Sequence, residues 1–323
     1  MSQESSKRSA LFMATRLIDL VEARFESAFS LTRTRGAAPL DELATSETDF
    51  EAVVFSLDVA MQKEQIEALP ESVRALATYS VGTDHIDLEV ARDRGLAVFN
   101  TPGVLADSVA ENALFLMLGA ARRASESVDL IRGRNWSGWS PRQLVGLQLS
   151  GRTLGILGMG DIGLRIAARA EALGMKILYS NRRQPSPGAA YASGYRASAE
   201  QLIRESDVLL LACPSTDETR GIVNAQLLAN AKPELILVNI ARGDLIEDEA
   251  LIAALREGRV WSAGLDVFAG EPDLNPGYFD LPNVFMLPHI GSSTREARVG
   301  MGQILIDALL DWKAGLPVSN RVC

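Results

Sequence analysis

One segment of the chain restricts the fold more than any other. Thr153–Leu157 is a short apolar run typical of a buried strand. Three glycines, Gly158, Gly160 and Gly163, follow it, and the residues after Gly163 continue in a helical pattern. Glycines at such a strand-to-helix turn permit a tight bend and a close approach to a pyrophosphate, which the helix N-terminus favours. We therefore predict a dinucleotide-binding unit whose cofactor contacts are Gly158, Met159, Gly160, Asp161, Ile162 and Gly163.

Strand-like and helical segments alternate along most of the chain. This alternation is typical of βαβ units and predicts an α/β protein with parallel sheets. The expected strands are 53–55, 75–81, 96–99, 153–157, 176–179, 208–213 and 235–240, and the expected helices are 64–69, 88–95, 161–174, 199–205, 225–231 and 248–258.

The length of 323 residues favours two domains rather than one core. Long helical stretches at 108–132 and 294–314 divide the chain. We expect a Rossmann dinucleotide-binding domain over residues 101–289. A smaller, discontinuous, flavodoxin-like substrate domain is expected from residues 1–100 and 290–323, so that each domain is a doubly wound parallel sheet.

Composition excludes several classes of function. Hydrophobic residues make up 47% of the chain and charged residues 23%, which is ordinary for a folded globular protein. A net charge of −9 argues against nucleic acid as a partner. Two cysteines form neither a disulfide framework nor a metal-ligand spacing, and the longest apolar run, 113–121, is too short to span a membrane. We expect a cytoplasmic protein with no metal.

The strand after the glycine-rich turn bears on the choice of cofactor. Such a strand normally ends in an acid that binds the adenosine ribose, but here Ser180 is followed by Asn181, Arg182 and Arg183. Two guanidinium groups in place of the acid suit a 2′-phosphate. We therefore predict contacts from these four residues to NADPH in preference to NADH. A solvated turn is the alternative interpretation of the arginine pair, and use of NADH stays open.

Three polar residues follow strand-like runs in the second half of the chain. Arg242 follows 235–240, Glu271 follows 263–268, and His289 follows 284–287. Ligands bind beyond the carboxyl ends of the strands in open α/β sheets, so we expect these side chains near the cofactor. A cation, a carboxylate and a titratable base at one site indicate catalysis.

Several spaced motifs together resemble one family. They are Ser80-Val-Gly-Thr-Asp-His-Ile-Asp87, Asn100-Thr-Pro-Gly-Val-Leu105, Asn239-Ile-Ala-Arg-Gly243, Gly264-Leu-Asp-Val-Phe268 with Glu271-Pro272, and Leu287-Pro-His-Ile-Gly-Ser292. On these motifs the chain resembles the D-isomer-specific 2-hydroxyacid dehydrogenases, in particular the NADPH-dependent glyoxylate/hydroxypyruvate reductases. The resemblance implies hydride transfer from NADPH to a small 2-keto acid, which gives a D-2-hydroxy acid.

The resemblance also implies roles for individual residues. Arg242 would bind the keto acid, His289 would donate the proton, and Glu271 would stabilise the imidazolium form of His289. Trp139 would reach the substrate pocket of a neighbouring subunit, which implies a homodimer. Further substrate contacts would come from Val81, Gly82 and Ser292, and further cofactor contacts from Cys213, Pro214, Ile240, Ala241, Asp266 and Gly291.

Two alternatives remain at this stage. One is an NAD-dependent dehydrogenase for another 2-hydroxy acid, such as a phosphoglycerate or phenylpyruvate enzyme, although Asn181 stands where such an enzyme would carry an acid. The other is a non-catalytic, nucleotide-gated binding protein on the same scaffold. The sequence ranks neither the 2-keto acids nor the direction of the reaction.

Overall fold

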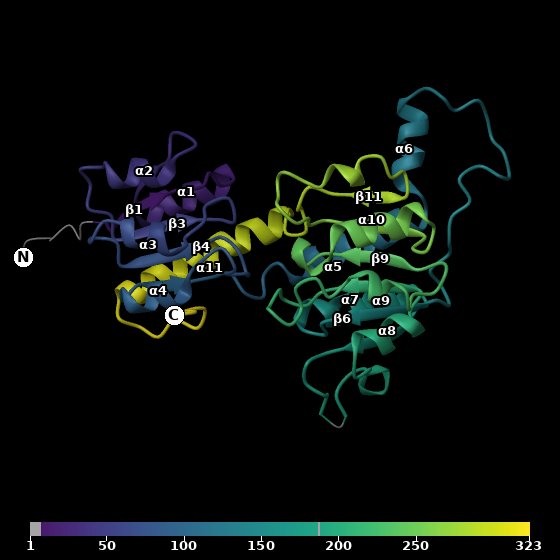
Figure 1. Ribbon diagram of the computed structural model, residues 1–323. Coiled ribbons are helices and arrows are strands. Elements are labelled where there is room, and N and C mark those ends of the chain that lie inside the picture. The colour runs from purple at the N-terminus through teal and green to yellow at the C-terminus, as the bar shows by residue number, and fades with distance from the viewer. Residues whose placement is uncertain (1–7, 187) are drawn as a thin grey trace, which may run out of the picture. The chain divides into compact units, whose positions relative to one another are not determined.

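The computed structural model describes residues 8–186 and 188–323, which form two compact units (Figure 1). The first unit contains the described residues up to Leu105 together with Ser293–Cys323, and the second is Ala106–Ser292. Each junction lies a few residues after the boundary expected from the sequence, at 100/101 and 289/290.

The first unit contains a parallel sheet of five strands in the order β2-β1-β3-β4-β5, which is the flavodoxin-like order. The inner strands β3 and β4 are buried at every position, as expected where helices cover both faces. The edge strand β2 is exposed at alternate positions. The strands are β1 Ala10–Met13, β2 Ser30–Arg33, β3 Ala52–Phe55, β4 Ala75–Thr78 and β5 Ala97–Phe99.

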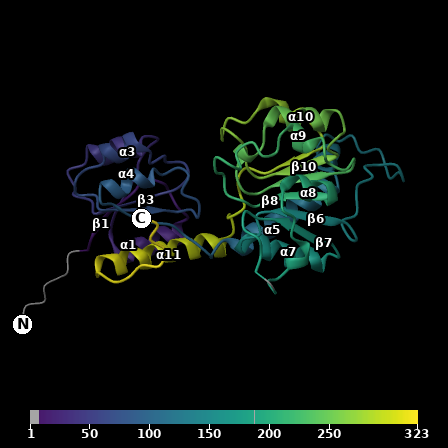
Figure 2. The same ribbon diagram turned by 60° about the horizontal axis from the view of Figure 1, so that its bottom comes forward.

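Helices cover both faces of this sheet. On one face α1 (Asp19–Ala28) packs along α11 (Arg295–Lys313), and on the other lie α3 (Lys63–Ala68) and α4 (Leu88–Asp93) with α2 (Pro39–Ala44) (Figure 2). Helix α11 begins after Thr294, whose hydroxyl accepts the N–H of Ala297.

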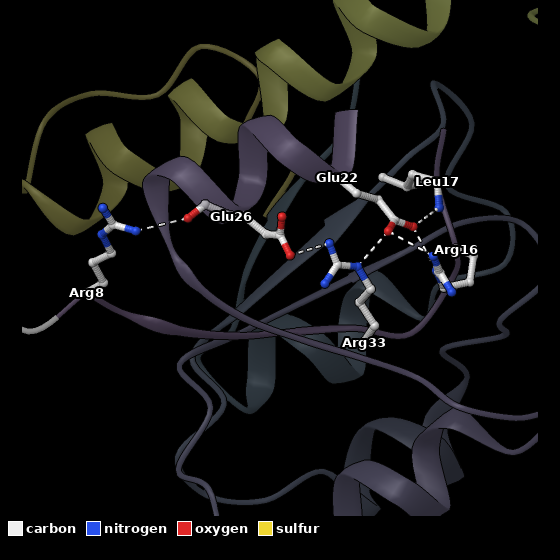
Figure 3. Close-up of polar contacts among 6 residues, drawn as sticks. All are labelled: Arg8, Arg16, Leu17, Glu22, Glu26 and Arg33. Atoms are coloured by element: carbon white, nitrogen blue, oxygen red, sulfur yellow. Dashed lines mark hydrogen bonds and ion pairs between the residues drawn. The ribbon is translucent and has the colours of Figure 1, made fainter. Parts of the chain in front are cut away.

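A buried carboxylate holds the start of α1 in place. The side chain of Glu22 is 4% exposed and accepts hydrogen bonds from Nε of Arg16 at 2.8 Å, Nε of Arg33 at 2.6 Å and the N–H of Leu17 at 2.8 Å (Figure 3). Burial raises the pKa of Glu22, but these hydrogen bonds outweigh burial and leave the pKa below its ordinary value. Arg33 also pairs with Glu26, whose side chain is 51% exposed.

The second unit contains a parallel sheet of six strands in the order β11-β10-β9-β8-β6-β7. The chain leaves β6 for β7 at one edge and then returns to β8 on the other side, which is the doubly wound arrangement of a Rossmann domain. The strands are β6 Thr153–Leu157, β7 Lys176–Ser180, β8 Val208–Leu211, β9 Ile236–Asn239, β10 Ser262–Leu265 and β11 Val284–Met286.

Helices α5 (Ala106–Ala121) and α7 (Asp161–Ala172) lie on one face of the second sheet (Figure 2). The other face is covered by α8 (Ala199–Glu205), α9 (Ala225–Leu228) and α10 (Asp248–Arg256). The buried core on that side includes Leu202, Leu209, Leu237, Leu251 and Leu255.

The prediction of one helix over 108–132 is wrong. Helix α5 ends at Ala121, and a separate helix α6 occupies Ala124–Arg132. Arg123 between them has a left-handed backbone with φ of 56°. The carbonyl of Ala121 accepts the N–H of Leu147 at 2.8 Å, so a returning loop replaces the next turn of the helix.

Candidate active site

The glycine-rich turn joins β6 to α7 at the carboxyl edge of the second sheet. Gly158 has φ of +105°, and a Cβ there would lie 2.5 Å from the backbone nitrogen of Cys213. A Cβ on Gly163 would lie 2.5 Å from the carbonyl oxygen of Gly158. Any side chain at these two positions would push the turn away from β8 or from its own helix.

Gly160 differs from the other two glycines, because no atom lies within 4 Å of the Cβ position it would carry. Its open side adjoins the N-terminus of α7, a helix of 12 residues whose first N–H groups attract anions. The turn therefore fits the pyrophosphate of a dinucleotide, with space at Gly160 and backbone donors beside it. When bound, the dinucleotide supplies the hydride.

The residues after β7 lie beside this turn. The Asn181 side chain accepts the N–H of Met159 at 2.6 Å and donates to the carbonyl oxygen of Met159 at 3.3 Å. Arg182 and Arg183 are exposed, and neither forms an ion pair within the part of the chain that the structure describes. Asn181 thus shapes the turn, while two guanidinium groups remain available at its rim.

Arg242 follows β9 in a loop that a buried amide holds. Asn239 is fully buried; its Nδ2 donates to the carbonyl oxygen of Arg242 at 2.7 Å, and its Oδ1 accepts the N–H of Ala241 at 3.0 Å. A Cβ on Gly243 would lie 1.8 Å from the backbone of Phe268. The Arg242 loop therefore packs directly against the loop that carries Glu271.

His289 and Glu271 form a hydrogen-bonded pair. Nδ1 of His289 lies 2.7 Å from Oε2 of Glu271, and Oε1 of Glu271 accepts the N–H of Phe268 at 2.6 Å. Burial raises the pKa of Glu271, but hydrogen bonds from His289 and Phe268 and the charges of His289 and Arg242 outweigh it, so the pKa is lowered. An ionised carboxylate only accepts, so Nδ1 carries a proton and Nε2 is the atom left to exchange one.

Asp266 holds the loop that carries His289. Its side chain is buried, and its two oxygens accept the N–H groups of Ile290 and Gly291, each at 2.8 Å. Its carbonyl oxygen also accepts the N–H of His289 at 2.8 Å. Burial raises the pKa of Asp266, although these N–H groups and the charge of His289 oppose the shift. His289 has φ of 53°, a conformation that costs energy outside glycine and that these bonds maintain.

The remaining predicted residues are placed as follows. Cys213 and Ile240 are each 9% exposed at the carboxyl ends of β8 and β9, and burial raises the pKa of the Cys213 thiol to about 11, so the thiol stays protonated at neutral pH. Val81 and Gly82 lie in the first unit in the loop after β4, and Ser292 is the last residue of the second unit. Trp139 lies in the loop after α6 and is 83% exposed.

Sequence reasoning missed the structural roles of two residues of the site. The hydrogen bonds by which Asn239 holds the Arg242 loop were not foreseen, although Asn239 is the one polar residue in the run 235–240. Asp266 was predicted as a cofactor contact, and its bonds to the His289 loop were not foreseen. In both cases the available signal was a polar residue at the end of an otherwise apolar strand, which must find partners when buried.

The fold and the site define a nicotinamide-dependent oxidoreductase. The chain belongs to the D-isomer specific 2-hydroxyacid dehydrogenase family, because residues 114–291 match the model of that family's NAD binding domain. It is therefore an NAD(P)-dependent D-2-hydroxyacid dehydrogenase. Among the described residues, no helix is both long and apolar enough to cross a membrane.

Individual relatives match most of the chain. This protein is 43% identical to a glycerate dehydrogenase from Hyphomicrobium methylovorum over 84% of this chain and 85% of the relative. It is 38% identical to a glyoxylate reductase from Pyrococcus furiosus over 92% of this chain and 89% of that relative. The crystal structure of an NADPH-dependent glyoxylate/hydroxypyruvate reductase from Sinorhizobium meliloti, in complex with NADP and malonate, is similar with a TM-score of 0.86, 31% identity, and coverage of 98% and 97%.

Proposed function

We propose that this enzyme reduces glyoxylate and hydroxypyruvate to the D-2-hydroxy acids, with NADPH as the preferred hydride donor. The observation that carries the proposal is the 2.7 Å contact between His289 and Glu271 in the loops beside Arg242. Relatives named as glyoxylate reductases and as a glyoxylate/hydroxypyruvate reductase support the choice of substrate. In this proposal the second unit binds the cofactor, and Val81 and Gly82 are among the substrate contacts.

Each side chain then has a distinct task in reduction. The planar guanidinium of Arg242 binds the carboxylate and the keto oxygen of the substrate. Nε2 of His289 donates the proton to that oxygen as negative charge develops on it. Glu271 holds the ring through Nδ1 and stabilises the imidazolium until the proton leaves.

The preference for NADPH rests on the residues after β7. No acid follows Ser180, and the two exposed guanidinium groups of Arg182 and Arg183 are free of ion pairs among the described residues, so both suit a 2′-phosphate. The Sinorhizobium meliloti structure contains NADP in a protein 31% identical to this one, which supports the same choice.

The test is loss of nicotinamide absorbance with NADPH or NADH against glyoxylate, hydroxypyruvate, pyruvate and phenylpyruvate. We expect the highest kcat/KM with NADPH and one of the first two acids. A preference for NADH would contradict the cofactor assignment, and a preference for phenylpyruvate would contradict the substrate assignment. Binding of nucleotide without turnover of any acid would favour the non-catalytic alternative.

We also propose that the active enzyme is a homodimer. Helix α6 and the loop after it expose an apolar surface that a second copy would cover. The loop residue Trp139 would reach the partner's substrate site. Sedimentation equilibrium of the wild type and of W139A tests this proposal: a wild-type dimer is expected, and a wild-type monomer with full activity would contradict it. The exposed apolar side chains are Val128, Ile131, Trp136, Trp139 and Val145, with exposures of 47%, 57%, 54%, 83% and 63%.

A further inference from the structure

The loops that follow the neighbouring strands β8 and β9 are joined along their length. We call residues 212–224 the β8 loop; it runs beside the Arg242 loop, residues 240–247. Three backbone hydrogen bonds connect the two loops, from the N–H of Gly221 to the carbonyl oxygen of Asp244 at 2.8 Å, from that of Val223 to Leu245 at 3.0 Å, and from that of Glu247 to Val223 at 2.9 Å. All of these residues belong to the second unit. The two loops therefore keep a fixed position relative to each other.

The β8 loop also packs against the glycine-rich turn. The backbone nitrogen of Cys213 lies 2.5 Å from the position that a Cβ on the first glycine of that turn would occupy. Thr219 closes the loop, because its hydroxyl accepts the N–H of Thr216 at 2.8 Å and donates to the carbonyl oxygen of Pro214 at 2.8 Å. The β8 loop thus lies between the turn that fits a pyrophosphate and the Arg242 loop.

A side-chain contact reinforces the connection between the two loops. Oγ of Ser215 donates to Oδ2 of Asp244 at 2.7 Å, and Nη1 of Arg220 lies 2.9 Å from the same oxygen. The side chain of Arg220 is 64% exposed. Oδ1 of Asp244 is enclosed by protein and has no hydrogen-bond partner within the part of the chain that the structure describes. An exposed ion pair contributes little, so the hydroxyl of Ser215 is the stronger contact of this carboxylate with the β8 loop.

Asp244 lies two residues after Arg242, in the short helical turn Gly243–Leu245. Nδ2 of Asn239 holds the carbonyl oxygen of Arg242 at 2.7 Å on the side of β9. On the other side, the carbonyl oxygen and the carboxylate of Asp244 are bound to the β8 loop. The backbone of Arg242 is therefore held at both ends, and its position depends on where the β8 loop lies.

We propose that Ser215 and Asp244 are positioning residues that couple the nucleotide to the keto acid. Nucleotide bound at the glycine-rich turn fixes the β8 loop, and the bond between Ser215 and Asp244 passes this constraint to the backbone of Arg242. The substrate carboxylate then binds an arginine that is already in place, so each ligand strengthens binding of the other by the same factor. This inference rests on the proposed function, because it concerns the substrate arginine of that same reaction.

The test is the variant S215A, which removes the hydroxyl and leaves the backbone bonds between the loops. The Kd of NADPH is measured by its fluorescence without and with saturating oxamate, an unreactive analogue whose carboxylate adjoins a carbonyl group as in a 2-keto acid. The ratio of these two Kd values is the coupling. Oxamate should tighten NADPH in the wild type, and in S215A the coupling should fall about 3- to 30-fold, the effect of losing one hydrogen bond to a charged group. The Kd of NADPH without oxamate should stay unchanged, and KM for glyoxylate should rise more than kcat falls.

Two further variants examine the same bond. S215T keeps a hydroxyl at this position and should retain most of the coupling. D244N keeps an oxygen that accepts from Ser215 but removes the charge, so the coupling should fall in the same direction as in S215A but by less. D244N also serves as the second variant where S215A does not fold.

A matched control separates positioning from general stability. Ser206 stands just before β8, at the opposite end of the strand from Ser215, and its hydroxyl donates to the carbonyl oxygen of Leu202 at 2.6 Å. Ser206 is fully buried. S206A therefore also removes one serine hydrogen bond beside β8, and it should lower the melting temperature without changing the coupling or KM.

The outcomes distinguish the two proposals. A wild type that reduces glyoxylate, together with unchanged coupling in folded S215A and D244N, would overturn the positioning role alone. Equal losses of coupling in S206A and S215A would also overturn it, since they would indicate a general distortion. The same holds if oxamate leaves the Kd of NADPH unchanged in an active wild type. No turnover of any 2-keto acid by the wild type would overturn the proposed function and, with it, this inference.

Discussion

Glu271 and His289 are joined by a 2.7 Å hydrogen bond, and the second oxygen of the same carboxylate is bound to the N–H of Phe268. We predict that E271Q keeps the ring in place but removes the charge that stabilises the imidazolium. The kcat/KM for glyoxylate should fall by about tenfold or more, because the charge paired with the proton donor is lost. Steady-state kinetics measure this effect, and an unchanged kcat/KM would contradict the role of Glu271.

The acidic limb of the pH profile of kcat/KM for the wild-type enzyme provides a second test. The pKa of Glu271 is lowered in the folded protein, so its charge persists below the ordinary glutamate pKa of about 4.3. Glu271 should therefore stay ionised from neutral pH down to about pH 4.3, and protonation of Glu271 should not slow the reduction over that range. An acidic limb above about pH 6 that disappears in E271Q would show that Glu271 titrates there and would contradict the lowered pKa.

Asp266 should matter to catalysis through the His289 loop. In D266N one of the two acceptors for Ile290 and Gly291 becomes a donor facing an N–H group. We predict a loss of about 1 to 3 kcal/mol in the free energy of unfolding together with a lower kcat. Urea denaturation and steady-state kinetics are the measurements. The exposed Asp273 provides the control D273N, and equal effects in the two variants would contradict a special role for Asp266.

The arginine pair after β7 should determine the choice of cofactor. We predict that R182A combined with R183A raises the Kd of NADPH about 10- to 100-fold and leaves the Kd of NADH nearly unchanged, because charge-assisted bonds to a phosphate are lost. Fluorescence titration with both nucleotides measures this. R204A removes another arginine side chain of the second unit and should affect neither Kd. N181D should also weaken NADPH selectively, since Asp keeps the acceptor for Met159 but adds repulsion.

Glu22 and Glu26 offer a matched pair for stability, because both contact Arg33. The buried Glu22 should matter more: we predict that E22Q lowers the free energy of unfolding by about 1 to 3 kcal/mol and that E26Q lowers it by less than about 1 kcal/mol. The contribution of Glu22 should be complete above the unfolded pKa of about 4.3 and be lost as pH falls through the lowered pKa of the folded state. Urea midpoints at several pH values measure this, and equal losses in the two variants would contradict it.

The sequence was most informative where burial was complete. The strand 153–157 and the glycine-rich turn were predicted with the bounds that the structure shows, because a fully buried parallel strand leaves a continuous apolar run. Arg242 and His289 could be placed because each lies three residues after the end of a strand, β9 or β11, that is recognisable as a mostly apolar run. Glu271 lies six residues after the end of β10, so its contact with His289 depends on loop geometry that spacing alone does not specify.

The start of the chain was harder to interpret. Ala10–Met13 is the inner strand β1, which pairs with both β2 and β3, yet it was not among the strands expected from the sequence. The edge strand Ser30–Arg33 shows no apolar alternation, because Ser30 and Thr32 are exposed and one of the two half-buried positions is the charged Arg33. Helix α1 buries the charged Glu22, which no hydrophobic pattern predicts because its burial depends on arginines from two other segments.

The central claim is that His289, paired with Glu271, donates the proton in NADPH-dependent reduction of a small 2-keto acid. The most direct measurement is hydroxypyruvate reduction by the wild type and H289N, with the chirality of the glycerate determined and the Kd of NADPH measured for both. We predict D-glycerate from the wild type, and in H289N a kcat lower by about 10²- to 10⁴-fold with an unchanged Kd. L-glycerate, or an H289N enzyme as fast as the wild type, would contradict the claim.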